Sequence, residues 1–215
     1  MEKIDKLKKY FVNYNIDGYV VPKNDEYFGE YVKDNKDRLK FITNFSGSYG
    51  FAIILRKNNY LFVDGRYTLQ AEKQSGKFFK IKTIPKILPK TILRKKSLRI
   101  GYDPNLITRQ FLNTFFNFTD CKLIPVQKNL IDLIWKRKNK SYKGKFYHLP
   151  DDAVGQNVFK KVSKLIFVMK KKRIDYQFIT SSENSAWLLN LRGYDSQYTP
   201  IPHCIVLVDK RKKIK

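Results

Sequence analysis

Histidine and cysteine, the residue types that most often bind transition metals, are scarce in this sequence. The 215 residues include only two of each. Cys121 and Cys204 stand far apart and match no metal-site spacing, so we interpret both as small buried hydrophobic residues. Neither His148 nor His203 has several carboxylates near it in the sequence, and a two-metal site needs many ligands at once. The sequence therefore predicts neither a metal-binding residue nor a catalytic residue in this chain.

Long apolar runs and phosphate-binding loops are also missing. No stretch approaches the roughly 20 apolar residues that span a bilayer, and the amino-terminal MEKIDKLKKYF lacks the apolar centre of a secretory signal. Together with the cysteine usage, these absences indicate a protein of the reducing cytoplasm with no membrane partner. The segment SGSYG at 46–50 lacks the Lys-Ser/Thr pair of a P-loop and precedes a strand, so we interpret it as a turn that requires small residues.

Acidic residues are few, and the resulting charge needs an explanation. Asp and Glu number 19 against 44 Lys and Arg, which gives a net charge of +25. Either the lysines form solvated faces, or the chain binds anions such as nucleic acid weakly and without sequence preference. Lysine far outnumbers arginine and is spread along the chain, which favours solvated faces. We interpret the basic runs at 138–145, 170–173 and 210–213 as a linker, a helix C-terminus and a turn.

Helical and strand patterns alternate along the first 128 residues. From apolar periodicity we expect six strands and four helices. The expected strands lie at 16–22, 51–55, 60–66, 78–84, 97–104 and 121–126. The expected helices lie at 2–14, 67–74, 85–93 and 108–118. Thr108 suits the N-cap of the last helix, whereas Pro89 should shorten or kink the helix that contains it. This alternation indicates an α/β fold.

The first elements of this pattern occur a second time. A helix at 158–169 and a strand at 174–180 repeat the first helix and strand. The apolar run CIVLV at 204–208 then repeats FAIIL at 51–55, and a polar turn follows each. In the first copy the strand YLFVDGR at 60–66 completes a hairpin, whereas the chain stops where its counterpart should begin. We therefore expect a truncated second copy with two helices and two strands.

Three segments carry a more specific pattern. They are TNFSGSYGFAIILRKNNYLFVDGRYTLQAE at 43–72, NLIDLIWKRK at 129–138 and SSENSAWLLNLRGYDSQYTP at 181–200. The first contains Ser-Gly-Ser-x-Gly and Asp-Gly-Arg-Tyr, and the third contains the long run AWLLNLRG at 186–193. In this order, and over nearly the whole chain, they resemble the two N-terminal domains of the aminopeptidase P (Xaa-Pro aminopeptidase) family.

The resemblance implies a fold and a domain division. The fold class is α/β: a creatinase-like N-terminal domain with a mixed sheet flanked by helices, followed by a truncated second copy. We expect the first domain at 1–128, a linker at 129–150 and the truncated second domain at 151–215. Two residues depart from the family pattern, because Gln197 stands where a proline is expected and His203 where an aromatic residue is expected.

The family's chemistry belongs to a third domain that this chain does not contain. Family members release an N-terminal residue that precedes proline, using a pita-bread catalytic domain with two metal ions, usually manganese. The resemblance therefore implies a non-catalytic N-terminal fragment, a remnant or a split-gene product, with no cofactor of its own. Two alternatives remain open. The chain could form an assembly or regulatory subunit that pairs with itself or with a separately encoded catalytic domain, or it could be a basic nucleic-acid or anion-binding module.

Arg66 is the one residue to which the resemblance gives a functional role. The equivalent arginine in family members resembles a group that contacts the peptide at the substrate entrance, where a guanidinium can bind a carboxylate or a carbonyl. The alternative is an ion pair with Asp64 or Glu72 that holds the turn. Trp187, with Leu188 and Leu191, is expected to pack in a core.

Overall fold

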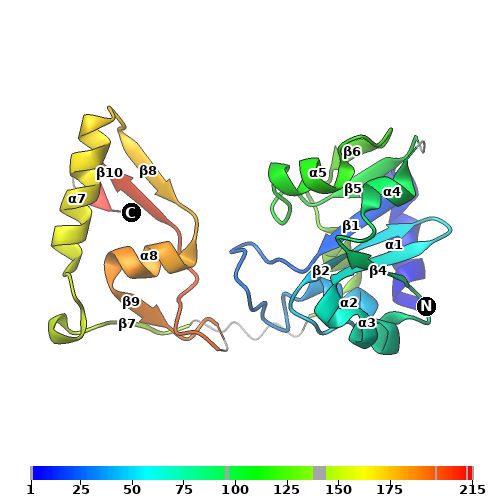
Figure 1. Ribbon diagram of the computed structural model, residues 1–215, viewed down its shortest axis with the longest axis horizontal. Helices are drawn as coiled ribbons and strands as arrows, with labels where there is room; N and C mark the ends of the chain where they lie inside the picture. The colour runs from blue at the N-terminus through cyan, green and yellow to red at the C-terminus, as the bar shows by residue number, and fades with distance from the viewer. Residues whose placement is uncertain (1, 95–96, 138–143, 197, 212, 215) are drawn as a thin grey trace. The chain divides into compact units, whose positions relative to one another are not determined.

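The computed structural model describes residues 2–94, 97–137, 144–196, 198–211 and 213–214. Contacts along the chain divide it into two compact units (Figure 1). Unit 1 comprises Met1–Glu26 and Asp34–Lys138, and unit 2 comprises Tyr27–Lys33 and Asn139–Lys215. Most of the basic run that was predicted to be a linker, at 138–145, lies outside the described residues.

Unit 1 is built on a mixed six-stranded sheet in the order β4-β3-β2-β1-β5-β6. Its strands are β1 (Gly18–Pro22), β2 (Gly50–Leu55), β3 (Asn59–Asp64), β4 (Lys80–Ile84), β5 (Arg99–Tyr102) and β6 (Lys122–Pro125). β2 is antiparallel to both β1 and β3, whereas β1–β5, β5–β6 and β3–β4 are parallel pairs. All six predicted strands are present, and the mixed α/β sheet is confirmed.

The helices of unit 1 are more numerous than predicted. They are α1 (Glu2–Asn13), α2 (Arg38–Thr43), η1 (Gly65–Tyr67), α3 (Thr68–Ser75), α4 (Pro89–Leu93), α5 (Arg109–Phe116) and α6 (Leu130–Ile134). α2 and α6, each under two turns long, were not predicted. The helix expected at 85–93 instead begins at Pro89. Proline is favoured in the first turn of a helix, because the backbone N–H that it lacks would have no partner within the helix there. Thr108 is confirmed as an N-cap, since its hydroxyl accepts the Phe111 N–H at 3.1 Å.

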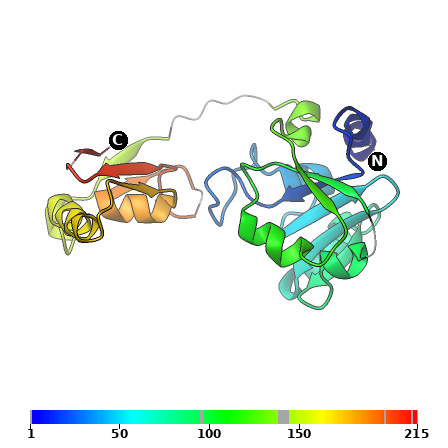
Figure 2. The ribbon, with the colours of Figure 1, turned by 90° about the horizontal axis from the view of Figure 1, so that it is seen from above.

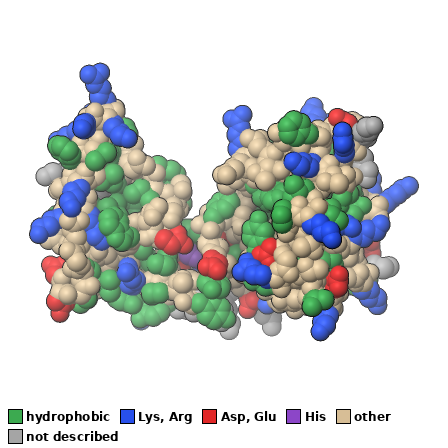
Figure 3. All heavy atoms as spheres, in the orientation of Figure 1, with side chains coloured by type: hydrophobic (Ala, Val, Ile, Leu, Met, Phe, Trp, Pro, Cys, Tyr) green, Lys and Arg blue, Asp and Glu red, His purple; other side chains and the backbone are tan. Residues whose placement is uncertain are grey.

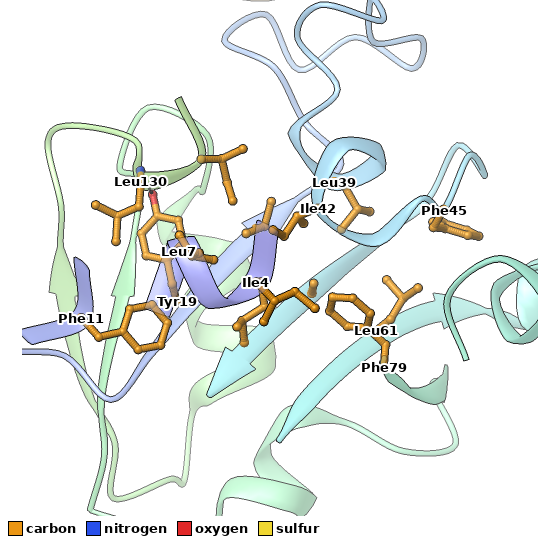
Figure 4. Close-up of a cluster of buried hydrophobic side chains, with 14 of the residues drawn as sticks. Ile4, Leu7, Phe11, Tyr19, Leu39, Ile42, Phe45, Leu61, Phe79 and Leu130 are labelled. Atoms are coloured by element: carbon orange, nitrogen blue, oxygen red, sulfur yellow. Dashed lines mark hydrogen bonds between the residues drawn. The ribbon is translucent and has the colours of Figure 1, made fainter. Parts of the chain in front are cut away.

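Both faces of the unit 1 sheet are covered. Side chains of α1 and α2 pack on one face with residues of β1, β2, β3 and the α6 region (Figure 4). In that cluster the Tyr19 ring is fully buried, and its hydroxyl accepts the Leu130 N–H at 3.4 Å. On the other face, Val20 and Phe51 pack with Phe115 of α5. Burial on both faces explains why the central strands β1, β2 and β3 read as nearly continuous apolar runs.

Unit 2 contains more strands than predicted. Its elements are β7 (Phe146–His148), η2 (Asp151–Ala153), α7 (Val158–Lys171), β8 (Tyr176–Ile179), α8 (Ser182–Leu189), β9 (Leu191–Gly193), β10 (Val206–Asp209) and β11 (Lys213–Ile214). The prediction of two strands and two helices is therefore wrong in its strands. β7, β9 and β11 have two or three residues each, too few to show an alternating pattern.

The second hairpin strand is present, contrary to the prediction. β11 pairs antiparallel with β10, placing Ile214 opposite Val208 and Lys213 opposite Asp209. The prediction that the chain stops before this strand is thus wrong, because the strand begins at Lys213. β10 also pairs antiparallel with β8, as β2 does with β1 in unit 1, so the internal repeat extends to strand pairing.

One layer of helices covers the sheet of unit 2. α7 and α8 lie on the same side of β8 and β10 (Figure 2). The core between them consists of Val162, Ile166, Met169, Leu188, Val206 and Val208. Lys170 and Lys171 occupy the last turn of α7, as predicted for this basic run. Within the described residues, no helix is long and apolar enough to cross a membrane.

Candidate functional site

Arg66 lies at the junction between β3 and α3 in unit 1. Asp64 ends β3 and caps the short helix η1, because its side chain accepts the Arg66 backbone N–H at 2.9 Å. The same carboxylate accepts the Arg66 Nη2 at 2.6 Å, which makes the ion pair that the sequence offered as an alternative. The hydrogen bond from Arg66 lowers the pKa of Asp64. The Arg66 guanidinium also lies over the Tyr67 ring, 5.2 Å from its centre, and remains mostly exposed.

The SGSYG turn lies beside this junction. The Ser48 and Tyr67 hydroxyls are 2.8 Å apart, and Gln70 donates to the Ser46 hydroxyl at 2.9 Å. A Cβ on Gly47 would stand 2.3 Å from the Phe45 ring and 2.9 Å from the Tyr67 ring, which explains the small residue here. The turn and the Asp-Gly-Arg-Tyr motif, separated in sequence, thus form one hydrogen-bonded surface around Arg66.

This surface can bind, but it carries no reacting group. A guanidinium with an exposed face can donate several fixed hydrogen bonds to a carboxylate or a carbonyl oxygen. The neighbouring Ser48 and Tyr67 hydroxyls already bond to each other. The chemistry that the geometry permits is therefore recognition of a peptide end or a peptide carbonyl. Whether Arg66 contacts a peptide stays a prediction.

His203 and Cys204 are consecutive in unit 2, whereas Cys121 belongs to unit 1. Across the part of the chain that the structure describes, no group of three or more His, Cys, Asp or Glu side chains could hold a metal ion. The family resemblance places its two-metal centre in a separate catalytic domain and not at these residues. Cys121 and Cys204 are half-buried rather than fully buried as expected. Burial raises the pKa of the Cys204 thiol.

The AWLLNLRG segment forms α8, a sharp turn and β9 in unit 2. Ser181 caps α8 by accepting the Asn184 N–H at 3.4 Å, and Asn190 ends the helix in the left-handed conformation, with φ of 51°. Gly193 follows in β9, where a Cβ would stand 2.7 Å from the Cβ of Pro202. The specific residues of this run therefore shape a turn and a close backbone contact.

Trp187 does not pack in a core, contrary to the prediction. Its side chain is 61% exposed, while Ala186 and Leu188 on either side are buried. The buried residues of α8 are Ser182, Ser185, Ala186 and Leu188, and Trp187 lies outside this buried face. Its ring instead lies 4.2 Å from the Lys161 ammonium, which also donates to the Trp187 carbonyl and to Asn190 Oδ1, each at 2.5 Å. Sequence reasoning missed this buried lysine.

His203 takes the place of the expected aromatic residue. Within unit 2 its ring stacks on Tyr27, with centroids 4.5 Å apart. The backbone N–H of His203 donates to the Asp195 carboxylate at 3.0 Å, and Asp195 forms an ion pair with Lys33 at 2.9 Å. An imidazole is a flat aromatic ring and can stack on another ring. The histidine at position 203 therefore makes the kind of ring contact that the expected aromatic residue would make. Gln197, the other departure, lies outside the described residues.

Basic side chains do not gather into one patch on the face that Figure 3 shows. Lys and Arg are dispersed there among apolar and acidic side chains. Twelve ion pairs join described residues, and several, such as Lys6–Glu2, are highly exposed. This distribution suits solvated lysine faces better than a shaped nucleic-acid groove.

Comparison with known families identifies both halves of the chain. Two sequence models, each described as a creatinase/prolidase N-terminal domain, match residues 3–134 and 136–215. The probable Xaa-Pro aminopeptidase P of Laccaria bicolor is 33% identical over 97% of this chain. Xaa-Pro aminopeptidase 1 of Dictyostelium discoideum is 30% identical over 98% of it. The matched region makes up 34% and 36% of these relatives, so the chain spans about a third of their length.

A solved structure extends the similarity to three dimensions. The X-prolyl aminopeptidase of Caenorhabditis elegans, described as a cytosolic enzyme with a di-nuclear active site, matches with a TM-score of 0.88 and 27% identity. The match covers 99% of this chain and 38% of the nematode chain. The resemblance inferred from the three sequence segments is therefore confirmed. The chain belongs to the creatinase/prolidase N-terminal domain family, and its relatives are Xaa-Pro aminopeptidases matched over their first domains.

Proposed function

We propose that this chain serves as the non-catalytic N-terminal part of a Xaa-Pro aminopeptidase. The observation that carries this proposal is the continuous match, over nearly the whole chain, to about a third of such enzymes. The parent activity is metal-dependent release of an N-terminal residue that precedes proline, and the metals and their ligands belong to the other two thirds. The described nematode relative supports a cytoplasmic location. We assign residues 1–128 to the first domain and 151–215 to the second. Within the connecting segment 129–150, α6 packs in the unit 1 core and β7 pairs with β9 of unit 2.

Within this function, Arg66 binds the peptide. Its guanidinium is exposed, is held at a fixed junction by Asp64, and lies beside the SGSYG turn. Asp64 engages Nε and Nη2, which fixes the orientation of the guanidinium at this junction. The role is to orient substrate and not to react with it.

A chimera tests the proposal. The chain replaces the matched N-terminal third of the Laccaria bicolor relative, and release of the first residue from an Xaa-Pro-Xaa tripeptide is measured with manganese supplied. We expect the chimera to hydrolyse the peptide and the isolated 215-residue chain to release nothing. A folded but inactive chimera, or turnover by the pure isolated chain, would contradict the proposal.

The same chimera tests Arg66. Arg66→Ala should raise the KM for the tripeptide several-fold and leave kcat nearly unchanged, because a contact made equally in ground and transition states alters only binding. Arg66→Lys should recover part of the loss. The matched control is Arg56→Ala, which breaks a comparably exposed ion pair with Asp17 elsewhere in unit 1. An unchanged KM for Arg66→Ala would leave Arg66 with its structural role alone.

A further inference from the structure

Unit 2 contains a small cavity whose lining combines aromatic residues with glutamates. The cavity has a volume of about 160 Å³. It lies between the Tyr27–Lys33 segment, the start of α8 and the segment that precedes β10. We name it the tyrosine cavity, and the lining residues that matter here are Tyr27, Glu30, Tyr31, Glu183 and His203.

The aromatic rings of the tyrosine cavity are held in place by other rings. Tyr27 stacks on His203, with ring centroids 4.5 Å apart and planes inclined by 22°. Tyr31 makes an edge contact with Tyr198, with centroids 4.9 Å apart. Because each ring already packs against a partner, little ordering is needed when a ligand enters. The faces of such rings attract positive charge.

The charge of this lining is opposite to that of the chain. The sequence has 44 Lys and Arg against 19 Asp and Glu, yet the described residues that line the cavity include two glutamates and no lysine or arginine. Lys33 is the one lysine of the Tyr27–Lys33 segment, and it pairs with Asp195 at 2.9 Å. Neither Lys33 nor Asp195 lines the cavity. The cavity is therefore a negative site on a strongly positive protein.

The two glutamates also differ from other carboxylates of unit 2 in their partners. Asp175, Asp195 and Asp209 each form an ion pair with a lysine or an arginine. Glu183 accepts a hydrogen bond from the Ser181 hydroxyl at 2.8 Å, but no ion pair joins it to another described residue. The side chain of Glu30 has neither a hydrogen bond nor an ion pair to any described residue. Two carboxylates without a basic partner thus meet at one cavity.

We propose that the tyrosine cavity binds the primary ammonium group of a small alkylamine. Glu30 and Glu183 supply the opposite charge, and the rings of Tyr27 and Tyr31 supply faces for a cation. A primary ammonium donates three hydrogen bonds, and the carboxylates can accept them. The hydroxyls of Ser196 and Thr199, which also line the cavity, are further acceptors.

The size of the cavity limits the ligand. Sites for drug-sized molecules have volumes of about 300–1,000 Å³. A cavity of about 160 Å³ is smaller, so it holds an ammonium group with a short alkyl chain. A lysine side chain of another protein presents the same chemical group. A test must therefore separate a free amine from a lysine that belongs to a polypeptide.

Nuclear magnetic resonance of the full 215-residue chain tests the site. The backbone amides are followed while n-butylammonium chloride is added at about pH 7, where an alkylamine is protonated. Sodium chloride keeps the ionic strength constant. We expect saturable shifts at Glu30, Tyr31, Glu183 and His203, and none in α3 of unit 1.

Three further ligands define the chemistry. 1-Butanol has the same alkyl chain without the charge, and tetramethylammonium has the charge without an N–H donor. Each should bind with a Kd at least about fivefold higher than that of n-butylammonium, because each lacks one of the two interactions. Nα-acetyl-lysine methylamide represents a lysine within a polypeptide, and its Kd should be no lower than that of n-butylammonium.

Matched variants locate the charge. Glu30→Gln and Glu183→Gln should each raise the Kd about threefold, and the double variant about tenfold, as expected for exposed ion pairs. Asp152→Asn removes an exposed carboxylate of unit 2 that does not line the cavity, and it should leave the Kd unchanged. Both glutamates are exposed, so these replacements should preserve the fold, which Trp187 fluorescence monitors.

Four results would overturn the inference. They are the absence of saturable shifts, equal binding of 1-butanol and n-butylammonium, equal Kd values for the double variant and Asp152→Asn, and a Kd for the lysine derivative at least tenfold below that of n-butylammonium. The last result would assign the cavity to a polypeptide. The inference does not rest on the proposed peptidase role, because binding is measured without peptide or metal. An inactive chimera would leave it standing, and an absence of shifts would leave the chimera experiment standing.

Discussion

Arg38 and Asp132 form a bidentate ion pair in unit 1, with Nε–Oδ1 and Nη2–Oδ2 distances of 2.8 and 2.9 Å. Arg38 is buried at the first residue of α2, and Asp132 belongs to α6. The Arg38 Nη2 also donates to Glu26 at 2.9 Å. The pair joins residues 94 positions apart, so it fixes the α6 segment against the helices at the start of the chain.

Loss of this arginine should destabilise unit 1. Arg38→Ala leaves Asp132 and Glu26 without their buried partner, and we expect a loss of about 3 kcal/mol in the free energy of unfolding. Urea unfolding followed by Trp135 fluorescence in a Trp187→Phe background measures it. Arg56→Ala serves as control, since its exposed pair with Asp17 should contribute under about 1 kcal/mol. If Arg38→Ala and Arg56→Ala lost the same free energy of unfolding, the burial of Arg38 would add nothing to the stability of unit 1.

Glu26 should make unit 1 sensitive to acid. Burial raises its pKa, but hydrogen bonds from Lys36 and the charge of Arg38 outweigh burial and hold the pKa at about 2. A carboxylate with a lowered pKa stabilises the fold above its unfolded pKa, so this contribution is complete above about pH 5 and is lost toward pH 2. Because Glu26 is one-third exposed, we expect only about 1–2 kcal/mol.

The variant Glu26→Gln isolates this effect. Unfolding free energies measured from pH 7 to pH 2 should fall less steeply for Glu26→Gln than for the unmodified chain. Glu72→Gln, on an exposed position of α3, should keep the original pH dependence. If the unfolding free energy fell equally steeply toward pH 2 in the unmodified chain and in Glu26→Gln, the acid sensitivity would be assigned to other carboxylates.

Gly193 should tolerate no side chain. A Cβ there would approach the Cα and Cβ of Pro202 to 2.9 and 2.7 Å, and the Gly193 N–H donates to the Pro200 carbonyl at 3.0 Å. The nearest atoms include backbone, so Gly193→Ala should cost about 1–3 kcal/mol in unit 2. Unfolding is followed by Trp187 fluorescence in a Trp135→Phe background. Gly155→Ala, where a Cβ meets no atom within 4 Å, is the control.

The sequence predicted elements whose pattern is set by burial within the chain itself. β1 and β2 are buried on both faces, and α1 and α7 each bury one stripe, so their apolar periods are clear. The exposure of Trp187 could not be predicted in the same way. An apolar stripe along a helix predicts that this face of the helix can be buried. It does not predict which sheet or helix packs against that face. Trp187 therefore resembled a core residue although no described layer covers it.

The same argument explains what was missed at the candidate site. The Asp64–Arg66 pair is local, and the sequence offered it as one of two alternatives. The contact of Ser48 with Tyr67, and of Arg38 with Asp132, depends on how the sheet brings distant segments together. Charge and hydroxyl groups have no period along the chain, so only tertiary structure reveals these partners. Short elements such as α6 and β9 are missed for the different reason that they contain too few residues.

Nucleic-acid binding should be weak and strongly dependent on salt. The net charge of +25 attracts phosphate, but the basic side chains on the visible face are dispersed and no base-reading motif is present in the sequence. Contacts to phosphate alone release counterions, so affinity for a random duplex should fall at least tenfold from about 50 to about 200 mM salt. Fluorescence anisotropy with two unrelated duplexes measures it. Tight binding at the higher salt to one duplex only would favour the nucleic-acid-binding alternative.

Hydrogen exchange should differ between the two copies of the hairpin. β2 lies between β1 and β3 in a sheet covered on both faces, so Phe51–Leu55 and Tyr60–Val63 should exchange only through global unfolding of unit 1. β10 lies between β8 and the two-residue β11, and its outward face is bare. The amides of Val206–Asp209 should therefore exchange at least tenfold faster. Mass spectrometry of the monomeric chain measures both regions together, which removes differences in pH and temperature. Equal protection would mean that unit 2 is as stable as unit 1 without a second covering layer, and that the bare face carries no energetic deficit.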